Sequence, residues 1–170
     1  MSLIIMVMGL PGSGKSFFSR RLADTLGASY IGSDELRNKM GLMGNYQMSF
    51  KHRVYQEMIR AAEAVIENNG EVVLDSTFFL KETRNKVEEL CHKYGTKLIP
   101  ILVEAEENII GERLSKPRRD SEADFQVYRQ IKESFEPLSG SYLSLLSTND
   151  NIEELIGKAI HYIENQHGKK

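Results

Sequence analysis

Residues 9–16 read Gly9-Leu10-Pro11-Gly12-Ser13-Gly14-Lys15-Ser16, which has the G-x-x-x-x-G-K-[S/T] spacing of a phosphate-binding loop. Its three glycines allow the backbone to take positive φ angles and to turn several N–H groups toward one point. Lys15 supplies a positive charge for the β- and γ-phosphates of a nucleotide, and Ser16 supplies a hydroxyl group for the ligand shell of Mg²⁺. We therefore predict that residues 9–16 bind a nucleoside triphosphate together with magnesium.

The residues on either side of this loop predict the strand and the helix that it requires. Residues 3–8 form a continuous apolar run, which is typical of a strand buried on both faces. Apolar residues then recur at helical spacing over residues 15–26, and Gly27 can end that helix. A glycine-rich turn that binds nothing is the alternative, and the adjacent Lys15 and Ser16 argue against it.

Strands and helices alternate along the rest of the chain. Further strands are predicted at residues 28–31, 72–75, 98–103 and 142–147, with helical patterns between them. One helix is predicted from His52 to Asn69, and the next one is predicted to end at Gly95. This alternation predicts a three-layer α/β fold of the P-loop NTPase kind, with a mainly parallel sheet of about five strands. We expect a single domain over residues 1–170. Pro100 conflicts with a central strand, because proline has no N–H to donate.

Composition narrows the class of protein. The chain of 170 residues is 41% hydrophobic and 27% charged, which is ordinary for a globular domain, and no segment is long enough to span a bilayer. A net charge of −2 gives no general attraction to nucleic acid. Cys91 is the only cysteine, which excludes an internal disulfide and predicts a buried thiol on a helix face. Met1 leads directly into the first predicted strand, so we expect a cytoplasmic protein.

Two carboxylates follow predicted strands. Asp75 ends the strand at 72–75, and Asp34 follows the strand at 28–31. Because the carboxyl ends of parallel strands meet at one edge of a sheet, we expect both to lie near the phosphate-binding loop. Asp75 is predicted to hold Mg²⁺. Asp34 is our candidate for the base that takes the proton from an acceptor hydroxyl, with Arg37 orienting the acceptor or its anionic group; a helix N-cap is the alternative role of Asp34.

The residues after Asp75 favour transfer to a hydroxyl over hydrolysis. Motor-type ATPases usually place a glutamate after this aspartate to polarise water, whereas Ser76 stands here. The Asp-x-x-Gly and Asn-Lys-x-Asp motifs of switch GTPases are also absent. The pattern predicts a kinase. A nucleotide-binding switch or weak ATPase without an acceptor is the alternative, and a structural domain with a vestigial loop is a third.

A basic segment lies between two predicted helices. It contains Arg113, Lys116, Arg118 and Arg119, interrupted by Pro117. A loop of this kind can close over the phosphates, so we predict a helical lid at about residues 113–125. Arg118 is predicted to act on the transferring phosphoryl group, and Arg113 and Arg119 to contact the nucleotide. A solvated charged turn is the alternative.

Together these motifs resemble the P-loop kinase-like ATP-binding proteins of the AAA_33 type. The matching segments are residues 9–16, 33–37, 73–78 with Arg84, and 121–124 with 135–137. That group is similar to the 5′-hydroxyl polynucleotide kinases and, more distantly, to zeta-toxin and chloramphenicol phosphotransferase kinases.

The resemblance implies a nucleoside-kinase-like fold and a phosphotransferase that depends on ATP and Mg²⁺. It matches Asp34 to the acceptor-side aspartate, Thr77 and Arg84 to the acceptor-side loop and helix, and Arg118 or Arg119 to the lid. Phe17 departs from the Thr or Ser that the group often has there, but Ser16 still supplies the hydroxyl.

The acceptor is either a small molecule or the 5′ end of a nucleic acid. Polynucleotide binding requires a basic channel with stacking aromatic residues. Basic and aromatic residues do occur together over residues 46–55, and they suit a helix surface equally well. We favour a small molecule.

Overall fold

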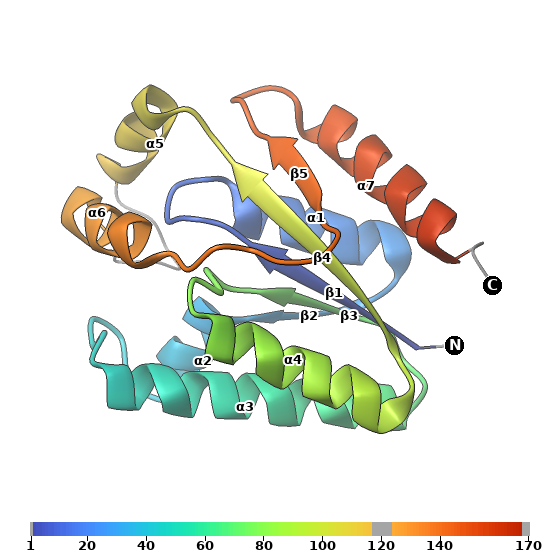
Figure 1. Ribbon diagram of the computed structural model, residues 1–170. Coiled ribbons are helices and arrows are strands. Elements are labelled where there is room, and N and C mark those ends of the chain that lie inside the picture. The colour runs from blue at the N-terminus through green and yellow to red at the C-terminus, as the bar shows by residue number, and fades with distance from the viewer. Residues whose placement is uncertain (1, 117–123, 168–170) are drawn as a thin grey trace.

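The computed structural model describes residues 2–116 and 124–167 as a parallel sheet between two layers of helices (Figure 1). The five strands are β1 (Leu3–Met8), β2 (Ser29–Gly32), β3 (Val72–Asp75), β4 (Lys97–Glu104) and β5 (Leu143–Leu146), in the order β2-β3-β1-β4-β5. The helices are α1 (Lys15–Leu26), α2 (Ser33–Lys39), α3 (Met48–Glu67), α4 (Lys81–Tyr94), α5 (Glu107–Leu114), α6 (Phe125–Ser134) and α7 (Ile152–His167). The predicted α/β fold with a five-stranded parallel sheet is confirmed.

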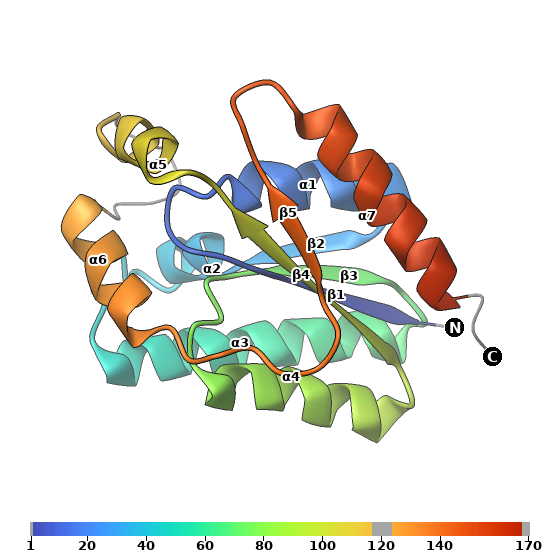
Figure 2. The same cartoon turned by 45° about the horizontal axis from the view of Figure 1, so that its top comes forward.

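The central strand β1 explains why its sequence is apolar at every position. Leu3, Ile5 and Val7 pack with α1 and α7 in one core cluster. Ile4 and Met6, which alternate with them, pack with α3 and α4 in the other. Because both faces of a parallel sheet are covered, each strand residue is removed from water, and full burial of a large aliphatic side chain contributes about 1.5–3 kcal/mol. Figures 1 and 2 show α1 and α7 on one side of the sheet and α3 and α4 on the other.

Pro100 lies in β4 without breaking the sheet. β4 pairs with β1 from Lys97 to Leu102, but β5 pairs only with Ile101–Glu104. The first half of β4 therefore has a neighbouring strand on one side only. The missing N–H of Pro100 can face the unpaired side, so the conflict noted in the sequence disappears.

The start of α2 corrects one expectation. We considered Asp34 as a helix N-cap, but the N-cap of α2 is Gly32, and no side chain caps that end. Asp34 lies in the first turn of the helix, where its negative charge complements the helix dipole. Its carboxylate accepts a hydrogen bond from the guanidinium of Arg37, one turn further along the same helix, at 2.8 Å.

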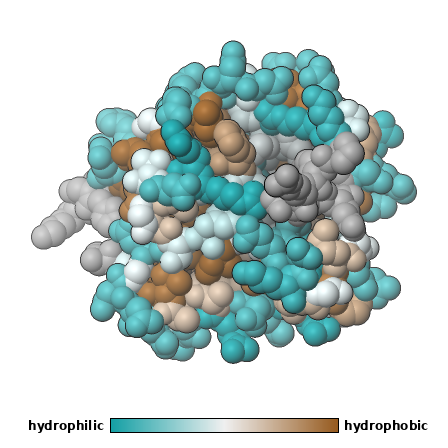
Figure 3. Space-filling view, turned by 180° about the vertical axis from the view of Figure 1, so that it is seen from behind, coloured by the Kyte–Doolittle hydropathy of each residue, from teal (hydrophilic) through white to brown (hydrophobic). Residues whose placement is uncertain are grey.

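The helices α2, α5 and α6 lie near the carboxyl ends of the strands (Figure 1). Both ends of the described chain lie at the opposite edge of the sheet. Seen from behind, hydrophilic side chains cover most of the visible surface, and apolar ones form small patches among them (Figure 3). In the part of the chain that the structure describes, no helix has the length and apolar character to cross a membrane.

Candidate active site

A cavity of about 600 Å³ opens at the carboxyl ends of the strands. Its lining comes from the phosphate-binding loop, the start of α2, the start of α3, the end of β3, the end of α5 and the segment after β5. Ten of the predicted site residues line it: Pro11, Gly12, Gly14, Lys15, Ser16, Asp34, Arg37, Asp75, Thr77 and Arg113. The topology thus brings together residues that lie as much as about 100 positions apart in the sequence.

The phosphate-binding loop has the backbone that its glycines allow. Gly14 has φ 90° and precedes α1 as its N-cap, and no side chain caps that helix. Gly9 has φ 155°, and a Cβ atom there would lie 2.4 Å from the carbonyl oxygen of Val103. Any side chain at position 9 would therefore push the loop away from β4. An uncapped helix N-terminus behind a glycine loop provides N–H groups and a positive dipole end for an anion.

Arg113 connects α5 to this loop. Its guanidinium donates hydrogen bonds to the carbonyl oxygen of Gly12 at 3.1 Å, to Ser147 Oγ at 3.0 Å and to the carbonyl oxygen of Thr148 at 2.9 Å. Ser147 in turn donates to the carbonyl oxygen of Ser13 at 2.6 Å. Partial burial lowers the pKa of the Arg113 guanidinium. The contacts of Arg113 support the loop; its predicted contact with the nucleotide stays a prediction.

Asp75 has one oxygen that is held and one that is not. Tyr30 donates its hydroxyl proton to Asp75 Oδ2 at 2.7 Å, and burial together with the charge of Asp75 raises the pKa of Tyr30. Asp75 is 3% exposed, and its Oδ1 is buried without a hydrogen-bond partner in the described structure. An orphaned buried carboxylate oxygen fits a place in the ligand shell of Mg²⁺.

The described residues contain no group of three or more His, Cys, Asp or Glu side chains that could hold a metal alone. This fits Mg²⁺ in nucleotide sites, where one or two protein oxygens are completed by phosphate oxygens and water. Ser16 and Asp75 both line the cavity and are the residues that would hold the ion.

The other side of the cavity is formed by Asp34 and Arg37. The guanidinium of Arg37 donates to Asp34 Oδ1 at 2.8 Å and lies over the ring of Tyr46, 5.0 Å from its centroid. The Nζ of Lys51 lies 4.9 Å from the centroid of the Phe79 ring. Burial and the charge of Arg37 lower the pKa of Lys51. Two cations, each lying over an aromatic ring, thus line the same cavity as Asp34.

The segment after β3 is fixed by hydrogen bonds. The hydroxyl groups of Ser76 and Tyr55 share a hydrogen bond of 2.8 Å, and the Phe78 N–H donates to the Tyr55 hydroxyl at 3.3 Å. Phe78 has φ 48°, a conformation that a bulky residue rarely adopts, and this turn follows Thr77. The carbonyl oxygen of Thr77 accepts from the N–H of Gly9 at 3.3 Å, which ties the segment to the phosphate-binding loop.

Arg84 is the predicted acceptor-side residue that the structure does not bring to the cavity. Its guanidinium donates to the main-chain oxygens of Phe78 at 2.7 Å, Glu136 at 3.2 Å and Pro137 at 3.0 Å. Burial lowers its pKa. These contacts indicate that Arg84 positions the segment after β3 against the segment after α6. Arg118 and Arg119 lie outside the described residues, as does most of the predicted lid.

Sequence reasoning missed two residues of the site. Tyr30 carries no motif, and its contact with Asp75 spans 45 positions. Lys51 was noticed only as part of a basic and aromatic stretch. If the order of the strands had been known, the register of β2 and β3 would have placed Tyr30 beside Asp75. The helical phase of residues 48–67 would then have placed Lys51.

Comparisons with known proteins agree with this fold. The model of the family AAA_33, described as an AAA domain, matches residues 4–138. A shikimate kinase from Corynebacterium efficiens is 27% identical over 168 residues, which cover 95% of this chain and 96% of that protein. An uncharacterized protein from Mycobacterium tuberculosis is 25% identical over 123 residues; the match spans 65% of this chain and only 25% of the length of that protein.

Two solved structures share the fold. A sugar kinase from Janibacter has a TM-score of 0.75 at 15% identity, covering 96% of this chain and 95% of its own. The APS kinase of Mycobacterium tuberculosis, in complex with AMPPNP and APS, has a TM-score of 0.72 at 17% identity, covering 96% and 98%.

Proposed function

Because the chain belongs to the AAA_33 family of AAA domains, we propose that it is a kinase that moves the γ-phosphoryl group of ATP to a hydroxyl group of a small molecule. The observation that carries the proposal is the single cavity with the phosphate-binding loop on one side and the Asp34–Arg37 pair on the other. Similarity to shikimate kinase over nearly the whole chain supports the reaction class.

The described residues divide the work of phosphoryl transfer. Lys15 and the loop N–H groups bind the phosphates of ATP. Asp34 accepts the proton of the acceptor hydroxyl, whose oxygen forms the new bond to the γ-phosphorus while the bond to the β–γ bridging oxygen breaks and ADP leaves. Arg37 holds the Asp34 carboxylate through the 2.8 Å contact. Mg²⁺, when bound at Ser16 and Asp75, would neutralise charge on the β- and γ-phosphates.

Hydrolysis of ATP has less support in this site. The residue after Asp75 is Ser76, and its hydroxyl group is engaged with Tyr55 at 2.8 Å. A hydroxyl in that position is a poor base for water. Among the described residues of the cavity, no contact therefore supports the alternative of a nucleotide-binding switch or a weak ATPase.

The test is label transfer from γ-labelled ATP with Mg²⁺ to two acceptor pools. One pool contains small alcohols, including sugars, sugar acids and nucleosides, and the other contains oligonucleotides with a 5′-hydroxyl group. We expect label on a small alcohol. Free phosphate without any labelled acceptor would favour the switch or ATPase and would remove Asp34 as a base.

The first prediction concerns Asp34 itself. Asp34→Asn should reduce transfer by about 10²- to 10⁴-fold, the usual contribution of a general base, while leaving ATP binding nearly unchanged. The rate is measured by label transfer and ATP binding by calorimetry. Asp24→Asn on α1 is the control, because Asp24 is exposed and does not line the cavity. Full transfer by Asp34→Asn would contradict the assigned role.

A further inference from the structure

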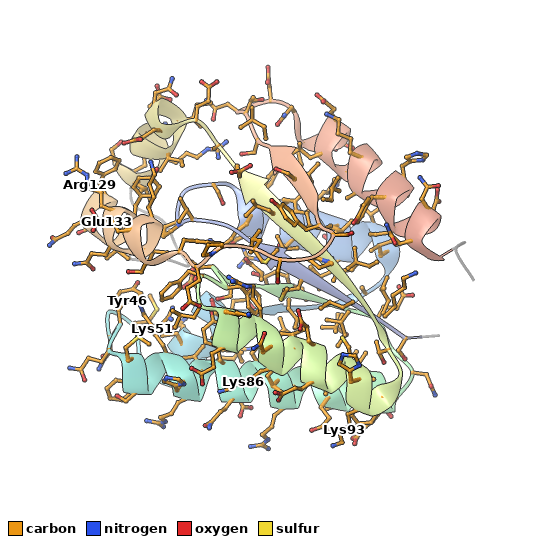
Figure 4. The ribbon with its side chains drawn as sticks, viewed as in Figure 1. Tyr46, Lys51, Lys86, Lys93, Arg129 and Glu133 are labelled. Carbon is orange, nitrogen blue, oxygen red and sulfur yellow. The ribbon has the colours of Figure 1, made fainter. Side chains whose placement is uncertain are left out.

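Lys51 is a cation in the cavity that has no anionic partner among the described residues. It belongs to the first turn of α3, is half-buried and lines the cavity. Its described contact is with the face of the Phe79 ring, and no carboxylate of the described residues pairs with it. Figure 4 shows Lys51 near Tyr46 at the end of α3 that lies toward α6, whereas Lys86 and Lys93 follow along α4 toward the opposite end.

Arg37 is the second cation of this region. It is 8% exposed, and although one of its terminal nitrogens pairs with Asp34, its Nε is buried without a hydrogen-bond partner in the described structure. A buried guanidinium nitrogen without an acceptor is unusual, because leaving such a donor unsatisfied costs free energy. Arg37 and Lys51 line the same cavity, and the positive charge of Arg37 disfavours the charged form of Lys51.

The described lining of the cavity also carries more positive than negative side chains. It contains six basic residues, Lys15, Arg20, Arg37, Lys51, Arg113 and Lys116, and two acidic ones, Asp34 and Asp75. The phosphates of ATP would neutralise the positive charges near the phosphate-binding loop. On the acceptor side, Asp34 neutralises one of the two positive charges of Arg37 and Lys51. Among the described residues, the positive charge of Lys51 on the acceptor side is left without a counter-charge.

Resting on the proposed function, we propose that the acceptor is a small hydroxyl compound that also carries a carboxylate or phosphate group, and that this anionic group binds Lys51 and Arg37. The anion would accept from the guanidinium of Arg37 and from Nζ of Lys51, which are charge-assisted hydrogen bonds. The hydroxyl group of the same molecule would then face Asp34, which Arg37 already contacts. The two cations therefore select and orient the acceptor.

The aromatic residues favour a small acid over a polynucleotide. Single strands bind through aromatic faces on which bases stack. Here the face of Tyr46 is covered by the guanidinium of Arg37, and the face of Phe79 is covered by the ammonium of Lys51. One face of each ring is thus occupied by a cation and is not open to a base, and the ring shields that cation from water, which strengthens an ionic contact.

The first experiment measures binding without catalysis. The full-length protein, with ADP and Mg²⁺ bound, is acylated with an amine reagent in the presence of matched pairs of probes: gluconate against glucose, glycerol 3-phosphate against glycerol, and inorganic phosphate alone. Labelling of Lys51 and Lys86 is then read by peptide mass spectrometry. Lys86 is the internal control, because its ammonium pairs with Glu82 at 3.7 Å on α4 and does not line the cavity.

We expect at least one anionic probe to slow the acylation of Lys51 and not that of Lys86, and the neutral partner of that probe to have no effect. Protection by gluconate identifies a carboxylate subsite, and protection by glycerol 3-phosphate or phosphate identifies a phosphate subsite. If no anion protects Lys51, or if neutral probes protect it equally, the subsite is overturned.

The second experiment separates this inference from the proposed function. For an anionic acceptor, Lys51→Gln should raise KM by about tenfold to a hundredfold, the usual effect of losing a charge-assisted hydrogen bond, and leave the Kd of Mg-ATP unchanged. Lys86→Gln should change neither. Protection of Lys51 without any phosphoryl transfer would leave the anion subsite standing and overturn the kinase. Two results would leave the kinase standing and overturn the anionic small acceptor. One is transfer to neutral alcohols at a rate that Lys51→Gln does not change, and the other is preferred labelling of oligonucleotides.

Discussion

Tyr30 joins the carboxylate of Asp75 to the acceptor side of the cavity. Its hydroxyl donates to Asp75 Oδ2 at 2.7 Å, and its ring lies 5.0 Å from the guanidinium of Arg20. Arg20 pairs with Glu35 of α2 at 2.9 Å. A partner that holds one oxygen of a metal-binding carboxylate fixes the direction of the other, which for Asp75 is the unpartnered Oδ1. In the proposed magnesium site, Tyr30 would therefore position the carboxylate of Asp75 and would not itself be a ligand.

Removing the Tyr30 hydroxyl should weaken the binding of magnesium with the nucleotide. Tyr30→Phe leaves the ring in place but frees Asp75 Oδ2, so we expect the apparent Mg²⁺ affinity in the presence of ATP to fall by about tenfold to a hundredfold. Calorimetric titration of Mg²⁺ into the protein with ATP measures this effect without turnover. Tyr142→Phe is the control, because Tyr142 is 40% exposed and does not line this cavity. Equal Mg²⁺ affinity in both variants would refute the role.

Gly32 is the one residue in the sequence that reflects this contact. Position 32 lies on the same face of β2 as Tyr30, and a Cβ atom at Gly32 would lie 2.3 Å from the Tyr30 hydroxyl oxygen. Gly32 pairs in register with Asp75, so the missing side chain leaves the room through which the hydroxyl reaches the carboxylate. The phosphate-binding loop and Asp75 could be predicted because their spacing is local. The roles of Tyr30 and Lys51 could not, because they depend on which strands and helices become neighbours.

At the scale of elements, the boundaries that glycine sets were predicted well. Gly27 and Gly95 take left-handed conformations, with φ 66° and 62°, and end α1 and α4 as expected. The start of α3 was placed too late, at His52, whereas the helix begins at Met48. Met48 is 49% exposed, so the first turn of α3 carries no apolar periodicity from which to predict it. That turn nevertheless carries Lys51 into the cavity.

Arg84 is the contact through which α4 holds two loops together. Its guanidinium reaches main-chain oxygens in the segment after β3 and in the segment after α6, and it is 6% exposed. Arg84→Met should therefore destabilise the fold by about 2–4 kcal/mol, because several buried carbonyl groups lose their donor. Urea denaturation measures the loss, and hydrogen exchange should show faster exchange at Glu136, whose N–H donates to the carbonyl oxygen of Phe79 at 2.9 Å.

Lys86→Met, one half-turn along the same helix, is the matched control, and we expect it to change stability by less than about 0.5 kcal/mol. A similar loss in both variants would show that Arg84 contributes through general helix packing and not through the two loops.

At the scale of the whole molecule, ligand binding and stability are linked. The phosphate-binding loop joins β1 to α1, contacts α5 through Arg113 and approaches β4 at Val103, so the nucleotide site is made by the central part of the fold. A ligand that binds only the folded state at a hundredfold excess over its Kd adds about 2.7 kcal/mol of stability. For a domain of this size, we expect Mg-ATP to raise Tm by about 5–10 °C. Thermal melts with and without Mg-ATP measure the shift.

Lys15→Met should largely abolish this shift while leaving the Tm of the free protein nearly unchanged, since Lys15 makes no hydrogen bond or ion pair within the described structure that the substitution would break. An unchanged Tm of the unsubstituted protein in Mg-ATP would support a vestigial loop and count against the proposed roles of Lys15, Ser16 and Asp75 in binding Mg-ATP.

The two halves of the cavity come from separate stretches of the chain. The acceptor side is formed largely by residues 33–79, whereas the nucleotide side is formed largely by residues 11–17 together with residues 113–116 and 147–155, and Arg20, Val127 and Ile131 complete the lining. A change of acceptor can therefore be made largely within one stretch and without substitutions in the phosphate-binding loop. Recombination that exchanges this stretch between related genes would carry the choice of acceptor with it as a heritable unit, so members of one family can diverge in what they phosphorylate while keeping a common way of using ATP.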